Sequence, residues 1–169
     1  MTAAVAVVNG EETRYLAPAR TEEELQAQID AHLVRAPGGV QINENEISYD
    51  GGRFIMTFAE PGQQVGTDHT VQASSDCTFA WHCFYDGINF TYPRGRFSDC
   101  GWQDMSAWGW HDRTESVAQN LLATWIQYLN HTTGGHGNDV HLFFTDTLFE
   151  EISDVAPYRN MADHGVRHC

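Results

Sequence analysis

The fold is decided by the stretch Trp108-Gly109-Trp110-His111-Asp112-Arg113-Thr114-Glu115-Ser116-Val117. Two tryptophans flank a glycine, and a polar run ending in a β-branched residue follows them. Flat aromatic side chains pack well on pleated sheets, so this composition favours β structure around a tight corner. A weaker copy, Tyr158–Val166, has an aromatic residue, a basic residue, Asn160, an acid and a valine in the same order, with one residue inserted. The two copies predict a repeated Greek-key unit.

Short strands separated by turns are expected from residue 77 to the C-terminus. The strand candidates are Phe84-Tyr85, Asn89–Tyr92, Arg96-Phe97, Trp125–Leu129 and Val140–Phe144. A glycine-rich loop, Gly134–Asp139, separates the last two candidates. Short strands at regular spacing indicate a sandwich or a barrel.

The N-terminal part predicts a helix followed by a β-hairpin. Thr21 and Glu24 form a capping box that begins the helix, and Pro37-Gly38-Gly39 ends it. The apolar stripe of this helix consists of Leu25, Ile29 and Leu33. Two strands, 46–49 and 53–58, flank Asp50-Gly51-Gly52, and glycine supplies the positive φ that hairpin turns require.

The predicted fold class is therefore α+β, in three segments. Residues 1–62 form an N-terminal extension with the helix and hairpin, residues 63–76 form a linker rich in Gly, Gln, Ser, Thr and Asp, and residues 77–169 form a mainly-β domain. The helix-hairpin is too small to be very stable alone, so it is expected to pack on the rest of the chain or on a partner.

Composition and charge exclude several classes of protein. Hydrophobic residues make up 41% of the chain and aromatic residues 12%, which is enough for a packed core. The formal net charge is −14, so nucleic acid and anionic membranes are not expected partners. No apolar run reaches the ~18 residues of a membrane-spanning helix. Such acidity suits a soluble extracellular protein, a cation binder, or a protein whose partner has a basic face.

The four cysteines are Cys77, Cys83, Cys100 and Cys169. None forms a CxxC pair, so we expect two disulfides, with all three pairings open. Disulfides imply an oxidising compartment. Residues Met1–Gly10 lack the basic start and the apolar length of a signal peptide. We therefore expect either that a leader has been removed or that the protein leaves the cell by another route, such as lysis.

Three segments together resemble the Streptomyces metalloproteinase inhibitor-like family of peptidase inhibitors: Cys83-Phe84-Tyr85-Asp86, Gly95-Arg96-Phe97-Ser98-Asp99-Cys100 and Trp108–Val117. The resemblance covers residues 77–120 well and extends more loosely to 121–169 through Tyr158–His164. Because that family has a βγ-crystallin-type fold, the resemblance implies two crystallin-like Greek keys, at about 77–120 and 121–169. It also implies a secreted bacterial protein that inhibits a peptidase or binds another partner.

Crystallin-like folds also bind calcium through hard oxygen ligands. The aligned stretch is His111–Ser116, in which Asp112, Glu115 and Ser116 are the candidate oxygen donors. His111 and Glu115 depart from the calcium pattern, and so do Arg159 and His164 in the second copy. The alternative is that Asp112 and Ser116 bond backbone groups in a folded hairpin while Arg113 covers an aromatic face.

An inhibitor needs a stiff exposed loop, because preorganisation reduces the entropy lost on binding. If Cys77 pairs with Cys83, the pair closes a small ring that contains Thr78, Phe79, Ala80, Trp81 and His82. This ring is the candidate binding loop. The alternative is that the disulfide only fixes the entrance of the β-domain.

Histidine is abundant, and catalytic motifs are absent. His131, His136 and His141 recur every five residues, and His164 and His168 lie four apart. Neutral imidazole is a good zinc ligand, but a glycine-rich loop sets no geometry, so surface or turn histidines are the expectation. The sequence has no GxSxG, HExxH or P-loop motif.

We therefore expect a non-enzymatic extracellular binding module that resembles a peptidase inhibitor, without a cofactor unless calcium binds. One alternative is a virion or particle surface protein, bacterial or phage, whose residues 1–60 dock onto a shell while the β-domain faces outward. Another alternative is a calcium-binding structural protein of the crystallin type. The expected partner is a protein, either a peptidase or a capsid component.

Overall fold

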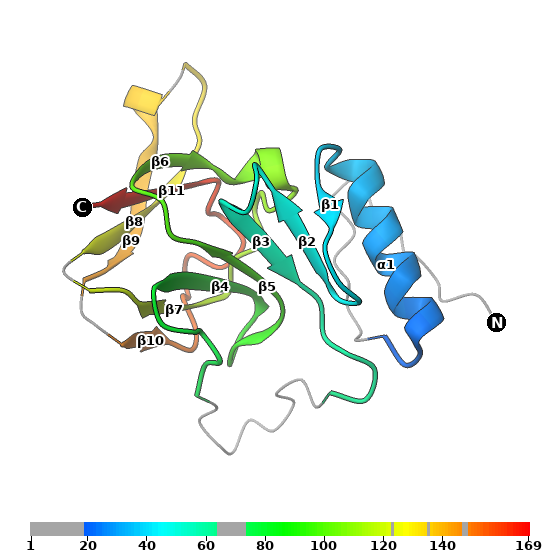
Figure 1. The fold of residues 1–169 in the computed structure, drawn as a ribbon. Coiled ribbons are helices and arrows are strands. Elements are labelled where there is room, and N and C mark those ends of the chain that lie inside the picture. Colours follow the sequence, from blue (N-terminus) through cyan, green and yellow to red (C-terminus); the bar gives the residue numbers. More distant parts are fainter. Residues whose placement is uncertain (1–18, 64–73, 123, 135, 147–148) are drawn as a thin grey trace.

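The computed structural model of this chain describes residues 19–63, 74–122, 124–134, 136–146 and 149–169. Within these residues the chain is mainly β, with one α-helix and two antiparallel sheets (Figure 1). The α+β class predicted from sequence is confirmed at this level. The helix, α1, spans Glu22–Arg35, and its cap residue Thr21 accepts a hydrogen bond of 3.1 Å from the Glu24 N–H. The Glu24 carboxylate accepts from the Arg20 N–H rather than from the cap residue.

The larger sheet crosses the boundary predicted between residues 1–62 and 77–169. Its strand order is β1-β2-β3-β5-β4-β7-β10. The bounds are β1 Val40–Gln41, β2 Glu46–Tyr49, β3 Phe54–Thr57, β4 Trp81–Gly87, β5 Thr91–Phe97, β7 Ser116–Asn120 and β10 Glu150–Ile152. Strand β3 of the N-terminal hairpin pairs with β5, with Phe54 opposite Phe97. The hairpin thus extends the sheet of the predicted β-domain. Residues 64–73 of the predicted linker lie outside the described residues.

The smaller sheet has the order β6-β11-β8-β9. Its bounds are β6 Gly101–Asp104, β8 Trp125–Asn130, β9 Val140–Thr145 and β11 His164–His168. A 3-10 helix, η1, spans Met105–Trp108 after β6, and a second, η2, spans His136–Asn138 in the glycine-rich loop between β8 and β9.

The two halves of the β-rich part exchange one strand each. Strands β4 to β7 come from residues 81–120, and strands β8 to β11 come from residues 125–168. The larger sheet contains β5-β4-β7 from the first half together with β10 from the second. The smaller sheet contains β9-β8-β11 from the second half together with β6 from the first. Each half therefore gives its third strand to the other sheet. The repeats at about 77–120 and 121–169 stay a prediction.

The two copies of the decisive stretch are paired by matching backbone hydrogen bonds. We call Trp110–Val117 the first corner and Tyr158–Val166 the second corner. The Asp112 N–H donates to the Ala162 carbonyl at 3.2 Å, and its counterpart, the Asn160 N–H, donates to the Thr114 carbonyl at 3.0 Å. Both donors have positive φ, 52° for Asp112 and 57° for Asn160. The two corners therefore have matching backbone hydrogen bonds and matching positive φ at these positions.

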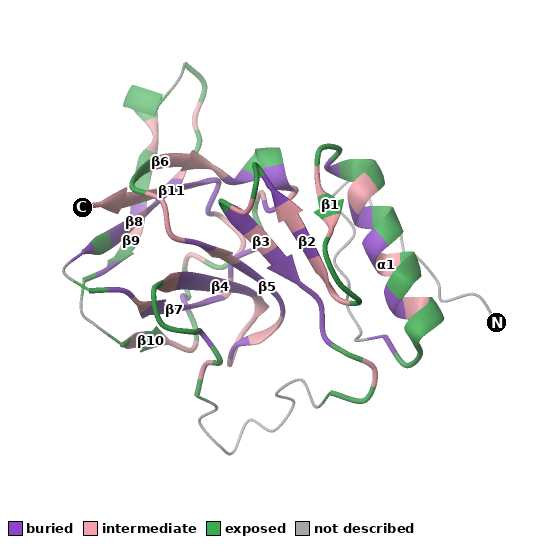
Figure 2. Cartoon of the chain, viewed as in Figure 1, coloured by how far each residue is buried: buried purple, intermediate pink, exposed green. Residues whose placement is uncertain are grey.

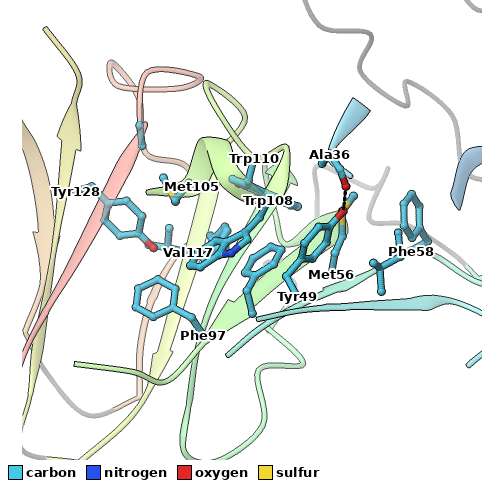
Figure 3. Packing of buried hydrophobic residues seen from close by; sticks show 14 of the residues in the cluster. Ala36, Tyr49, Met56, Phe58, Phe97, Met105, Trp108, Trp110, Val117 and Tyr128 are labelled. Carbon is cyan, nitrogen blue, oxygen red and sulfur yellow. Dashed lines mark hydrogen bonds between the residues drawn. The ribbon is translucent and has the colours of Figure 1, made fainter. Parts of the chain in front are cut away.

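The largest hydrophobic cluster joins the helix, the hairpin and both halves of the β-rich part (Figures 2 and 3). The Trp108 ring stacks on Phe54 of the hairpin, with centroids 4.3 Å apart. Trp110 is fully buried and meets Phe84 edge to face at 5.0 Å. The Tyr49 hydroxyl donates to the Ala36 carbonyl at 3.1 Å and so ties the hairpin to the end of α1 (Figure 3).

Gly109 lets the backbone between the two tryptophans pass close to α1 and its C-terminal end. Its φ is +68°, in the left-handed region that favours glycine. A Cβ atom here would lie 2.8 Å from His32 Cε1 and 3.0 Å from Ala36 Cβ. The quoted stretch therefore decides the fold because it is where the helix packs on the β-rich part.

Two disulfides close the β-rich part. Cys77 pairs with Cys83, and Cys100 pairs with Cys169. The expectation of two disulfides is confirmed, and one of the three open pairings is selected. The first bridge closes a ring across 6 positions of sequence, whereas the second spans 69 positions and ties the C-terminus to the turn before β6.

Candidate functional site

The Cys77–Cys83 ring is a fixed turn at the start of β4. The Trp81 N–H donates to the Thr78 carbonyl at 3.3 Å, which closes the turn. Two further hydrogen bonds tie the ring to the end of β7: the Ala80 N–H donates to the Asn120 carbonyl, and the Asn120 side-chain amide donates to the Cys77 carbonyl, both at 2.8 Å. The ring is therefore held by the disulfide and by the sheet.

The five predicted loop residues differ in exposure. Thr78, Phe79 and Ala80 are exposed, and Phe79 retains 61% of its exposed area. Trp81 is half-buried, and the Arg96 guanidinium lies 5.0 Å from the centre of its ring. His82 is fully buried and hydrogen-bonded to the Tyr128 hydroxyl, and burial lowers the pKa of its imidazole to about 3. The surface that the ring presents is thus Phe79 with its two neighbours.

Two more exposed apolar residues lie at the same end of the larger sheet. Leu122 lies two residues after the end of β7 and is 58% exposed, and Phe149 directly precedes β10 and is 63% exposed. The registers place Trp81 opposite Asn120 and Glu150 opposite Gln119, so the ring, Leu122 and Phe149 belong to neighbouring strand ends. We call Phe79, Leu122 and Phe149 the apolar end. Exposed apolar groups gathered in one place are typical of an interaction surface.

The residues predicted as calcium ligands have separate hydrogen-bond partners. The buried Ser116 hydroxyl donates to the Gly87 carbonyl at 2.6 Å and accepts from the Phe90 N–H at 3.0 Å. The Glu115 carboxylate accepts from the Asn160 amide at 2.8 Å. Asp112 Oδ2 lies 3.1 Å from His111 Nδ1. Calcium binding by these residues stays a prediction.

Arg113 covers an aromatic face, as the alternative to calcium binding predicted for this stretch. Its guanidinium carbon lies 4.7 Å from the centre of the Trp110 ring. The same group donates to the Gly109 carbonyl and to the Asp86 carboxylate, each at 2.9 Å. Arg113 therefore covers the face of a core tryptophan and ties the corner to the end of β4.

A cavity of about 290 Å³ lies beside the second corner. Its lining residues are Trp102, Asp104, Ser106, His111, His131, His136 and His164. They come from one end of the smaller sheet, where β6 and β8 end and β11 begins. The His136 ring stacks on Trp102 at 3.5 Å. Four imidazoles, those of His111, His131, His136 and His164, therefore line one cavity.

Asp139 connects two of these imidazoles. His164 Nδ1 lies 2.6 Å from one of its carboxylate oxygens, and His131 Nδ1 lies 3.2 Å from the other. Only 1% of the Asp139 side chain is exposed. Burial alone would raise the pKa of this carboxyl, but the hydrogen bonds from His164 and His131 outweigh burial and lower the pKa.

A second histidine–carboxylate group borders the same cavity. His111 Nε2 lies 2.6 Å from Asp163 Oδ1, and Asp163 is 3% exposed. The other Asp163 oxygen accepts a hydrogen bond of 2.7 Å from the His131 N–H. Because Asp112 contacts the same imidazole, three residues of the two corners meet here.

Sequence reasoning found only part of this arrangement. His131, His136 and His164 converge, whereas His141 packs near Phe144 and His168 stacks on Trp125. Asp139 and Asp163 were missed. Two features of the sequence could have indicated these carboxylates. Asp163 occupies the position in the second copy that Glu115 occupies in the first, and Asp139 has histidines on either side of it in the sequence.

The disulfides fit an oxidising compartment. Among the described residues, no helix has the length and apolar character needed to cross a membrane. In comparisons with protein-family models, curated proteins and solved structures, nothing matches the chain.

Proposed function

We propose that this chain is an extracellular, non-enzymatic binding module and that residues 77–169 form two βγ-crystallin-like Greek keys. The exchange of β6 and β10 between the sheets supports the Greek keys, since each half contributes its third strand to the other half's sheet. The paired hydrogen bonds of Asp112 and Asn160 support a common origin of the two units. This architecture is the one implied by the resemblance to the metalloproteinase inhibitor-like family.

The ring closed by Cys77 and Cys83 is the proposed contact surface. The observation that carries this proposal is Phe79, a large apolar side chain 61% exposed on a turn held by a disulfide and by β7. Such a turn is already ordered before it meets a partner, so little conformational entropy is lost on binding. Leu122 and Phe149 extend the apolar contact area.

The proposed partner is an extracellular peptidase. A rigid turn that carries one apolar residue suits entry into a concave, mostly apolar substrate cleft. The net charge of −14 favours a partner with a basic surface and raises the rate of encounter with it.

The proposal is tested by titrating bacterial metallo- and serine peptidases with the disulfide-intact protein up to micromolar concentration. Inhibition is expected for at least one peptidase class. Phe79→Ala is expected to weaken inhibition at least tenfold, because a central anchor residue contributes about 2 kcal/mol or more. Phe144→Ala is the matched control, since this phenylalanine is 49% exposed on β9 and lies outside the ring.

Two results would contradict the proposal. One is the absence of inhibition or complex formation with every peptidase tested. The other is an equal loss of inhibition in Phe79→Ala and Phe144→Ala, which would place the contact elsewhere. Because Phe79 is exposed, its substitution leaves folding intact, and a failed variant would reflect binding rather than stability.

A virion or particle surface role is the second proposal and has less support. It relied on residues 1–60 as an anchor to a shell. The described part of that segment instead packs within its own chain, since β3 pairs with β5 and Ile29 of α1 is fully buried in the main hydrophobic cluster.

A further inference from the structure

Three metal-ligating residues from different segments meet at one end of the smaller sheet. His131 follows β8, Asp139 precedes β9, and His164 begins β11. Strands β8, β9 and β11 are neighbours in this sheet, so its hydrogen bonds hold the three positions together. The glycine-rich loop between His131 and Asp139 is therefore fixed at both ends. The pairing of the strands, which the sequence alone does not show, sets the positions of these two residues.

The ligand atoms of this group already lie within coordination range. One atom each from His131, Asp139 and His164 lies within 4.8 Å of the others. Neighbouring ligands of a tetrahedral zinc ion lie about 3.3 Å apart, given zinc–ligand distances of about 2.0–2.1 Å. The separation of 3.2 Å between His131 Nδ1 and Asp139 Oδ1 fits this value, and the 2.6 Å between His164 Nδ1 and Asp139 Oδ2 must widen by about 0.7 Å.

The chemistry of the group favours a transition metal over calcium. Two imidazoles and one carboxylate form a ligand set that suits zinc, iron, cobalt or nickel, whereas calcium takes oxygen ligands. The cavity of about 290 Å³ borders both imidazoles, so solvent or a further ligand can complete the coordination.

We propose that His131, Asp139 and His164 bind a divalent transition-metal ion, such as Zn²⁺, through the two Nδ1 atoms and the carboxylate. The ion replaces the two hydrogen bonds that now join the imidazoles to Asp139. His136 and His111 line the remaining space of the cavity. This site is independent of the apolar end and of the proposed peptidase contact.

The test is a calorimetric titration of the metal-free, disulfide-intact protein with ZnCl₂ at pH 7.5, together with a titration by Co²⁺ followed by visible absorption. One ion per chain is expected, and the cobalt bands should show nitrogen and oxygen coordination. His131→Ala is the main variant, because its side chain is 44% exposed and its removal should leave the fold intact. We expect it to weaken Zn²⁺ binding at least tenfold. His141→Ala, an exposed histidine on β9, is the matched control and should bind as the wild type does.

A measurement without substitutions guards against a folding artefact. Histidine ring signals in ¹⁵N NMR spectra of the wild type should move for His131 and His164 on addition of Zn²⁺, whereas those of the buried His82 should not. The proposal is overturned if no ion binds up to millimolar concentration. It is equally overturned if His131→Ala binds like the wild type, or if the shifted signals belong to other histidines.

Discussion

The first and second corners have matching backbone hydrogen bonds but carry different side chains. In the first corner, Ser116 is fully buried and its hydroxyl bonds Gly87 and Phe90. The aligned position in the second corner is His164, whose imidazole reaches Asp139 instead. The matching backbone bonds of Asp112 and Asn160 hold both corners.

The difference shows how a repeat acquires two roles. Because serine is small, the first corner packs closely against the turn between β4 and β5, where the Ser116 hydroxyl bonds Gly87 and Phe90. The histidine at the same position, His164, is also buried, but its imidazole lines a cavity instead of closing on a hairpin. From the first corner, His111 reaches the same cavity. The first corner is therefore expected to govern stability, and the second to govern ligand chemistry.

The largest contrast is expected from the aromatic residue that opens each corner. Trp110→Ala should lower the free energy of unfolding by about 3–5 kcal/mol, because this fully buried ring packs on Phe84. Tyr158→Ala should lower it by about 1–2 kcal/mol, because this side chain is only half-buried. Urea unfolding followed by circular dichroism measures both. Equal losses would mean that the first corner does not dominate the core.

Acid should act on the contact between α1 and the chain before the first corner through His32, which is buried and lies 3.0 Å from the Trp108 carbonyl. Burial, and to a smaller extent Arg113, lowers the pKa of this histidine to about 3. Between pH 6.5 and 3 the unfolded chain binds a proton that the folded chain does not, so stability falls as the pH falls. The buried His82 acts in the same direction.

Each of the two histidines should contribute a slope of up to about 1.4 kcal/mol per pH unit in this window. Urea unfolding at pH 6.5, 5.5 and 4.5 gives the combined slope. His32→Gln should reduce it by one histidine's share, whereas the exposed His141→Gln should leave it unchanged. A slope that is the same in His32→Gln and in the wild type would contradict the account.

Removing a polar side chain within the first corner and one beside the second corner should also give unequal results. Ser116→Ala leaves the half-buried Gly87 carbonyl and the buried Phe90 N–H without this partner and should cost about 2 kcal/mol. His131→Ala beside the second corner should change stability by no more than about 0.5 kcal/mol, since the side chain is 44% exposed. Thermal unfolding of both variants measures the difference, and a larger loss for His131→Ala would reverse the assignment of roles.

The smallest effect should be equal in the two corners. Asp112 and Asn160 both have positive φ, which alanine tolerates less well than glycine does. At each position, alanine should be less stable than glycine by about 1 kcal/mol. The difference between the alanine and glycine variants is measured by urea unfolding. A difference at only one position would show that the corners are not equivalent in backbone.

Local sequence signals predicted the elements that depend on neighbouring residues. The cap at Thr21, the hairpin around Asp50-Gly51-Gly52 and the strands β8 and β9 follow from hydrogen bonding and turn geometry within a few residues. The repeat was visible because both corners keep the same order of residue types. The two disulfides were predicted from an even cysteine count, but their pairing depends on where β6 and β11 lie, which spacing does not give.

The candidate sites were predicted less completely because they depend on long-range pairing. The exposure of Phe79 on the ring was predicted, because a ring closed by two cysteines limits the conformations of the residues within it. Trp81 and His82 were assigned to the same exposed loop, but β4 begins at Trp81 and buries His82. The histidine group joins positions 131, 139 and 164, and only the order of β9, β8 and β11 brings them together.

The two corners are expected to be equivalent in backbone structure, and amide hydrogen exchange tests this equivalence most directly. The N–H groups of Asp112 and Asn160 are hydrogen-bonded across the repeat, and those of Glu115 and Asp163 bond Tyr85 and Leu129, each at 2.9 Å. Under native conditions, the two amides of each pair should be protected to a similar extent and far more than exposed turn amides. Rapid exchange of Asn160 and Asp163 beside strong protection of Asp112 and Glu115 would contradict the claim that one backbone unit occurs twice.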